Sequence, residues 1–169
     1  MDGIIYWITG LSCAGKTSIG KELYKYIKSN KKNVMFLDGD EYRPILFPHT
    51  GYSMEERREA AFRLGLFLQL LSNQGIDAVV CTISMFDDVR KWNRENIKFY
   101  KEIYLDVPMN ELVKRDRKGL YSRTVDNKED IVGVTVDAEF PKKPDIRVIN
   151  DGTKSIKDVV EYIIQELNI

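Results

Sequence analysis

The chain has 169 residues, with 26 basic and 26 acidic side chains, one histidine and two cysteines. A chain of this length can bury roughly 70% of its unfolded surface, so neither disulfides nor structural metals are needed for stability. The balanced charge excludes an overall field that would recruit nucleic acid or an anionic membrane. Any anion must therefore bind at a local site.

Two features of the composition bear on cellular location. Cys13 and Cys81 are far apart in otherwise ordinary segments, which is typical of reduced thiols in the cytosol. The N-terminus carries an acidic residue where a signal peptide carries basic ones, and no apolar run reaches the roughly 18 residues of a membrane span. We therefore expect a soluble cytoplasmic protein.

Short apolar runs alternate with helical periodicities along the chain, which predicts an α/β fold with a parallel sheet and crossover helices. The expected strands are rich in β-branched or aromatic residues, as strands buried on both faces are. They cover residues 4–9, 34–38, 78–83, 102–107 and 146–150. With no repeat or linker, residues 1–169 are expected to form a single domain.

Helices are expected between these strands. Ser53 and Glu56 form a capping-box pattern that should open a long helix ending near Gly75. Its inward positions are Ala61, Leu64, Leu68 and Leu71. Asp87 or Asp88 should cap the following helix, and Asn110 the one after. A last helix should carry Ile156, Val159, Val160, Ile163 and Leu167.

A long polar stretch, residues 119–145, contains glycines and prolines but no periodicity. Irregular segments of this length in a compact domain are usually functional. We therefore predict a lid in this region.

The stretch GLSCAGKTS at residues 10–18 follows the first expected strand, precedes a helix and contains the pattern GxxxxGK[ST]. In this motif backbone N–H groups wrap the β-phosphate, the lysine reaches the β- and γ-oxygens, and the threonine hydroxyl binds Mg²⁺. A glycine turn alone would not explain Lys16 and Thr17 at this offset. We predict that Lys16 is catalytic, that Thr17 is a metal ligand, and that ATP binds Gly10, Ser12, Cys13, Ala14, Gly15, Lys16, Thr17 and Ser18.

The second expected strand runs into LDGDEYR, residues 37–43. Carboxylates at i and i+2 after a parallel strand would project into the crevice where ligands bind in open α/β sheets. A kinase needs one acid there to help hold Mg²⁺ and another to accept the proton of the acceptor hydroxyl. We assign Asp40 as the base and Asp38 to the metal, with an exchange of the two roles left open. A solvated turn is the alternative interpretation.

The fourth expected strand leads into NELVKRDRKGLYSR, which carries Arg115, Arg117, Lys118 and Arg123 beside the lid. Such a basic run can be no more than a solvated helix face. In a phosphoryl-transfer enzyme, however, a basic segment that closes over the phosphates neutralises charge and excludes water.

The segment NKED, residues 127–130, matches the guanine-recognition pattern NKxD of GTPase switches. The residues before it are polar and do not resemble a buried strand, so we interpret the match as chance. A nucleotide-binding regulatory switch is nevertheless the alternative from another functional class, and selective GTP binding would support it.

The motifs ITGLSCAGKTS, LDGDEYR, GYSMEERRE, TISMF and RDRKGLYSR occur in the order and spacing of the adenylylsulfate kinases. The chain resembles this family from residue 4 to about residue 121 and more loosely to its end. The resemblance implies a P-loop three-layer sandwich with a five-stranded parallel sheet, helices on both faces and a lid. It also implies that MgATP phosphorylates the ribose 3′-hydroxyl of a nucleotide.

The same resemblance implies roles for individual residues. Lys118 should close over the reaction centre as a catalytic residue, and Arg115 should lie near the adenine of ATP. The acceptor should contact Asp40, Arg43, Tyr52, Arg57, Ile83, Ser84, Lys118, Gly119 and Leu120.

The chain departs from the family pattern where acceptor contacts are expected. Where the family has an asparagine, an arginine, a proline and a second arginine, this chain has Ala60, Phe62, Met85 and Asp87. Val132 stands where an aromatic residue of the family would stack on the acceptor base. A lost stacking platform removes roughly 1–3 kcal/mol, and each lost hydrogen bond about 0.5–3 kcal/mol. The usual acceptor should therefore bind much more weakly, while the ATP-handling motifs are unchanged.

This chain resembles, in length and in its position within the family, a branch that phosphorylates cytidine diphosphoramidate in bacterial capsule modification. We therefore expect a small-molecule nucleotide partner, with cytidine diphosphoramidate as the preferred acceptor and adenylylsulfate as the alternative. Mg²⁺ is the expected cofactor. Neither nucleic acid nor a membrane is expected as a partner, and a homodimer is left open.

Overall fold

The computed structural model describes residues 2–116, 119–123 and 131–169. Its centre is a parallel sheet of five strands in the order β2-β3-β1-β4-β5. The strands are β1 (Ile5–Thr9), β2 (Val34–Asp38), β3 (Asp77–Thr82), β4 (Tyr100–Asp106) and β5 (Ile146–Ile149). Their ends agree with the sequence expectation to within two residues.

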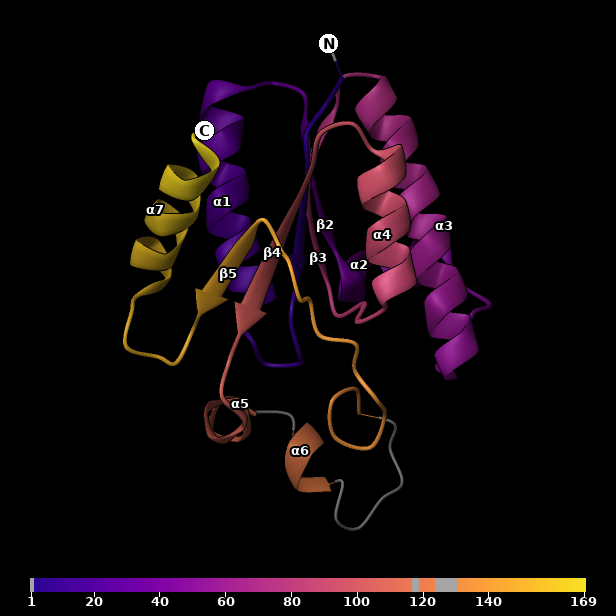
Figure 1. Cartoon of the computed structure of the whole chain (residues 1–169), viewed down its shortest axis with the longest axis vertical. Helices are drawn as coiled ribbons and strands as arrows, with labels where there is room; N and C mark the ends of the chain where they lie inside the picture. Colours follow the sequence, from indigo (N-terminus) through magenta and orange to yellow (C-terminus); the bar gives the residue numbers. More distant parts are fainter. Residues whose placement is uncertain (1, 117–118, 124–130) are drawn as a thin grey trace.

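Helices cover both faces of this sheet (Figure 1). One face carries α1 (Lys16–Asn30) and α7 (Ile156–Leu167), and the other carries α3 (Met54–Asn73) and α4 (Asp87–Asn96). Strand side chains alternate between the two layers, so Tyr6 and Ile8 pack toward α1 while Ile5 and Trp7 pack toward α3. The expected three-layer α/β sandwich is confirmed.

The capping box predicted for the long helix is present. The Ser53 hydroxyl accepts from the Glu56 N–H, and the Glu56 carboxylate accepts from the Ser53 N–H. The helix ends at Asn73, and its expected inward residues Ala61, Leu64, Leu68 and Leu71 are buried. A second capping box, Ser155 with Asp158, opens α7.

The other predicted caps are wrong by one or two residues. Phe86 is the N-cap of α4, and Asp87 and Asp88 lie in its first turn, where their charge favours the positive end of the helix dipole. Pro108 precedes α5 (Met109–Arg115), so Asn110 lies inside that helix. Ile156, the first residue of α7, is exposed, whereas Val159, Val160 and Ile163 are buried.

A short helix that the sequence analysis missed follows β2. It is α2 (Gly39–Leu46), and Asp38 is its N-cap, with one carboxylate oxygen accepting from the Asp40 N–H at 3.0 Å. A capping-box spacing from Asp38 to Glu41 was present in the sequence as a signal. Because of α2, Asp40 lies in a helical first turn and not in a simple loop.

The segment expected to be a lid leaves the sheet after β4 and returns at β5 (Figure 1). Its described parts contain α6 (Leu120–Arg123) and a bridge between Val132 and Val136. The NKED segment lies outside the described residues. Within the described ranges, no helix is long and apolar enough to cross a membrane.

Candidate active site

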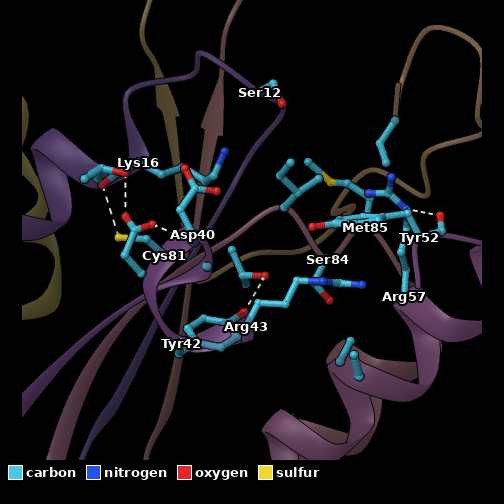
Figure 2. A pocket seen from close by; sticks show the side chains of 18 of the residues that line it. Ser12, Lys16, Asp40, Tyr42, Arg43, Tyr52, Arg57, Cys81, Ser84 and Met85 are labelled. Atoms are coloured by element: carbon cyan, nitrogen blue, oxygen red, sulfur yellow. Dashed lines mark hydrogen bonds between the residues drawn. The ribbon is translucent and has the colours of Figure 1, made fainter. Parts of the chain in front are cut away.

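A cavity of about 1030 Å³ opens at the carboxyl ends of the central strands. The loop after β1 and the first turn of α2 line one end, and the rest of α2 with the start of α3 lines the other, so the ligand-binding edge of the sheet is enclosed from both sides. Figure 2 shows Lys16 and Asp40 at one end, and Tyr52, Arg57 and Met85 at the other. The cavity is therefore large enough for two ligands placed end to end.

The phosphate-binding loop is shaped by Gly15, which takes a positive φ of 90° as the N-cap of α1. A side chain there would also crowd the Asn150 amide, whose nitrogen donates to the Ala14 carbonyl at 3.0 Å. Asn150 follows β5, so the end of the sheet holds the loop in place.

Lys16 is folded back onto this loop. Its ammonium donates to the carbonyls of Gly10 and Leu11, at 3.0 and 2.7 Å. Burial lowers the pKa of Lys16 to about 8, because the surrounding protein solvates the charged form less well than water does. The lysine therefore sits in an environment that would favour phosphate oxygens as partners.

Thr17 and Asp38 meet although they are far apart in sequence. The Thr17 hydroxyl donates to an Asp38 carboxylate oxygen at 2.5 Å, and Asp38 is buried. Both oxygens belong to the hard donor set that Mg²⁺ prefers. Mg²⁺ usually takes only one or two protein oxygens and completes its shell with water and phosphate, so this pair fits the metal.

Three residues form the far end of the cavity. The Tyr52 ring lies between two guanidinium groups, 4.5 Å from Arg43 and 5.2 Å from Arg57. Arg57 also donates to the Tyr52 carbonyl at 2.6 Å, and Arg43 donates to the Gly51 carbonyl. Because Tyr52 is 64% exposed, one positively charged aromatic platform faces the cavity mouth.

Part of the cavity wall is apolar. It includes the buried residues Ala60, Met85, Phe86 and Val132. Three of these, Ala60, Met85 and Val132, are departures from the family pattern, and all three line the cavity. The other two departures, Phe62 and Asp87, do not line the cavity.

The lid segment contributes Leu120, Val132 and Asp137 to the lining. Its first turn is tied to the phosphate-binding loop because the Tyr121 hydroxyl donates to the Ser12 carbonyl at 2.8 Å. Arg115, just before the lid, donates to the Asn150 carbonyl at 3.0 Å and also lines the cavity.

The cavity brings together most residues that the sequence analysis selected. Gly10, Ala14 and Gly119 do not line it, although the first two shape the loop through their carbonyls. Lys118, like Arg117, lies outside the described residues. The predicted residues that line the cavity are Ser12, Cys13, Gly15, Lys16, Thr17, Ser18, Asp38, Asp40, Arg43, Tyr52, Arg57, Ile83, Ser84, Arg115 and Leu120.

Other lining residues had not been selected. The Tyr42 hydroxyl bonds to the Thr82 hydroxyl at 3.3 Å, and burial raises the pKa of Tyr42 to about 12. Asp137 also lines the cavity, as an exposed carboxylate. Tyr42 could have been selected if the sequence analysis had predicted the helix over residues 39–46, whereas no local pattern indicated Asp137.

Comparison with known proteins identifies the family. The adenylylsulphate kinase family model matches residues 2–149. The chain belongs to the adenylylsulphate kinase family. It is therefore an ATP-dependent kinase that transfers a phosphoryl group to a hydroxyl, and this membership favours an enzyme over a regulatory switch.

Individual members of the family are similar over nearly the whole chain. Cytidine diphosphoramidate kinase of Campylobacter jejuni is 42% identical over 96% of this chain and 95% of its own length. Adenylyl-sulfate kinase of Pseudomonas aeruginosa is 34% identical over 94% and 84%. The structure of the Mycobacterium tuberculosis APS kinase CysC in complex with AMPPNP and APS superposes with a TM-score of 0.87, at 29% identity over 99% of both chains.

Proposed function

We propose that this kinase transfers the γ-phosphoryl group of ATP to the ribose 3′-hydroxyl of cytidine diphosphoramidate. The observation that carries this proposal is the 42% identity to cytidine diphosphoramidate kinase over nearly the full length of both chains. The adenylyl-sulfate kinase of Pseudomonas aeruginosa reaches 34% over 94% of the chain, and a probable adenylyl-sulfate kinase of Archaeoglobus fulgidus reaches 37% over 87%. Adenylylsulfate is therefore the alternative acceptor.

The acceptor end of the cavity supports this choice. Ala60 and Val132 are too small or too apolar to hold a purine by hydrogen bonds and stacking. Losing such contacts costs about 1–3 kcal/mol each in other nucleotide sites. The positive platform of Arg43, Tyr52 and Arg57 suits the diphosphate-like portion that both acceptors share.

In the proposed reaction the acceptor 3′-oxygen forms a bond to the γ-phosphorus, and the bond from that phosphorus to the β,γ-bridging oxygen breaks. ADP leaves, and Asp40 takes the proton of the hydroxyl. Lys16 moves from the loop carbonyls to the phosphate oxygens, where its charge counters the charge that develops there. Lys118 is proposed to close over the reaction centre.

Thr17 and Asp38 are proposed to hold Mg²⁺ with the nucleotide. When bound, the ion neutralises phosphate charge. Arg115, close to Asn150, is proposed to approach the adenine of ATP. A homodimer remains a prediction.

The test is a coupled ADP-release assay with ATP and a panel of acceptors. We expect kcat/KM for cytidine diphosphoramidate to exceed that for adenylylsulfate by about 10-fold or more, which corresponds to the loss of one or two acceptor contacts. CDP has the same base, ribose and diphosphate, so it serves as the control for the terminal phosphoramidate nitrogen, and a small polyol serves as the control for unspecific transfer. A higher kcat/KM with adenylylsulfate would overturn the proposal in favour of the alternative.

A further inference from the structure

Arg90 lies on α4 outside the cavity and is only 4% exposed. Its Nε atom lies 3.2 Å from Glu102 Oε1 on β4, and its Nη1 atom donates to the Ser84 carbonyl at 3.4 Å. Its Nη2 atom donates to the Glu139 carbonyl at 2.5 Å and to the Asp87 carboxylate. One buried guanidinium thus joins four separate segments.

Two of these segments belong to the acceptor end of the site. Ser84, directly after β3, lines the cavity, and its neighbour Met85 forms part of the apolar wall. Glu139 lies in the returning arm of the lid segment, and its N–H donates to the Met85 carbonyl at 3.1 Å. The hydrogen bonds of Arg90 to Ser84 and Glu139, together with the backbone bond from Glu139 to Met85, therefore hold the returning arm of the lid segment against the cavity wall.

The side chain of Glu139 adds to the same junction. Its carboxylate accepts from the Asp87 N–H at 2.5 Å and lies 3.5 Å from an Arg58 nitrogen. A guanidinium suits this place because its planar fork offers five donors in fixed directions, whereas a lysine offers one compact group.

The Arg90–Glu102 pair is poorly explained as a source of stability. Burial raises the pKa of Glu102, so the carboxylate is held in an environment that disfavours its charge. Replacing a buried ion pair by well-packed apolar residues of similar volume is often neutral for folding, whereas removing one partner alone is costly. A role in positioning accounts for the directed contacts to two carbonyl groups at the site.

We propose that Arg90 is a positioning residue for the acceptor, which holds the backbone of Ser84 and the returning arm of the lid at Glu139 in one fixed relation. The proposal rests on the proposed function only in placing the acceptor at this end of the cavity. It concerns a residue that touches neither substrate.

The test uses the double variant R90Q/E102Q, which leaves no unpaired buried charge. We expect kcat/KM for the acceptor to fall by about 10- to 100-fold, as misplacement of a binding wall produces, with KM for ATP nearly unchanged. Backbone amide exchange over residues 131–146 should become faster, because the Glu139 anchor is weakened. Exchange in α7 should not change.

Arg94 provides the matched control. It pairs with the same Glu102, at 3.1 Å, and with Asp145 at 2.9 Å, and its side chain is 43% exposed. R94Q should keep acceptor kcat/KM within about threefold, as expected of most surface substitutions, and should leave exchange near residue 139 unchanged. An equal loss in R94Q would overturn the proposal.

Two other results would also overturn it. One is a folded R90Q/E102Q enzyme with wild-type acceptor kcat/KM, and the other is an equal rise in KM for ATP and for the acceptor. If the double variant does not fold, R90K answers the question, since it keeps the charge beside Glu102 but loses the fork. The acceptor is whichever nucleotide the wild type phosphorylates fastest, so failure of the proposed function would appear in the wild type and not in these variants.

Discussion

At the scale of single residues, the donor end of the site depends on three side chains with different environments. Thr17 and the buried Asp38 are hydrogen-bonded to each other, whereas Asp40, two residues later, is exposed to the cavity. A metal ligand benefits from a fixed position, and a base must reach a substrate hydroxyl. The geometry thus favours the roles assigned to the two aspartates over their exchange.

Replacing each aspartate by asparagine should separate these roles. Asp40→Asn should lower kcat by about 10²–10⁴, the usual contribution of a general base, while ATP still binds with MgCl₂ present. Asp38→Asn should also weaken magnesium binding, which raises the Mg²⁺ concentration needed for half-maximal rate. Steady-state kinetics at varied Mg²⁺ would check both, and a raised Mg²⁺ requirement in Asp40→Asn alone would show that the roles are exchanged.

The lowered pKa of Lys16 makes ATP binding depend on pH. In the free enzyme this pKa is about 8, below the ordinary 10.5, and phosphate charge should raise it again when ATP binds. Above about pH 8 binding should therefore take up a proton, and affinity should fall by up to about tenfold per pH unit. Calorimetry at pH 8.5 in buffers of different ionisation enthalpy would measure the uptake.

Lys16→Ala is the control for that measurement. It should abolish the proton uptake and lower kcat by about 10²–10³, as loss of a main electrostatic stabiliser does, with folding intact. Proton uptake that persists in Lys16→Ala would contradict the assignment of this uptake to Lys16.

The lowered pKa of Lys16 also has a consequence for the stability of the fold. Because the unfolded chain binds more protons between about pH 8 and pH 10.5, the cost of burying Lys16 is present below pH 8 and relieved as pH rises.

At the scale of elements, the capping box of α3 is connected to the acceptor site. The Glu56 carboxylate accepts from the N–H groups of Gly51 and Ser53, and the Gly51 carbonyl accepts from Arg43. The hydrogen bond with Ser53 is the main cause that lowers the pKa of Glu56. The start of this helix therefore helps to position Arg43, which lines the cavity and is proposed to bind the acceptor, and it also stabilises the helix.

The chain offers a matched pair of variants for this connection. Glu56→Ala and Asp158→Ala remove the same position from the capping boxes of α3 and α7. Both should lower the free energy of unfolding in urea titrations, because each removes the side chain that accepts from the N-cap N–H. Only Glu56→Ala should raise KM for the acceptor, because only that box holds the loop beside Arg43. Equal KM values in the two variants would argue against the connection.

At the scale of the whole molecule, the site depends on how closely α1 packs on the sheet. A Cβ atom at Gly20 would lie 2.3 Å from the Cys81 sulfur, so the helix reaches the sheet only because this residue has no side chain. Cys81 also lines the cavity, and its thiol donates to the Lys16 carbonyl at 3.2 Å. The close approach of Gly20 to Cys81 thus lies next to the first turn of α1, which follows the phosphate-binding loop.

Gly20→Ala should therefore destabilise the protein by about 1–3 kcal/mol, as overpacking does, despite the better helix propensity of alanine. Thermal or urea unfolding would measure the loss. Cys81→Ala removes the sulfur, so the double variant Gly20→Ala/Cys81→Ala should recover much of it. No recovery in the double variant would mean that another contact limits the packing.

The sequence by itself determined the α/β class, all five strands, the phosphate-binding loop and the capping box of α3. These features follow from local signals: apolar periodicity, a glycine pattern at a fixed spacing, and a serine three residues before a glutamate. Family motifs also predicted that Arg43, Tyr52 and Arg57 contact the acceptor, and the structure brings these three residues together in the cavity lining.

Only the tertiary structure decided which distant groups meet. The bond from Thr17 to Asp38, the tie from Tyr121 to Ser12, and the junction at Arg90 each join residues from different elements. The helix α2 was missed because its glycine and aspartates are also typical of a turn. Local propensity depends only on residues close together in the sequence. The carboxyl edge of a parallel sheet brings together loops that are far apart in the sequence, so no local signal predicts which of their side chains meet.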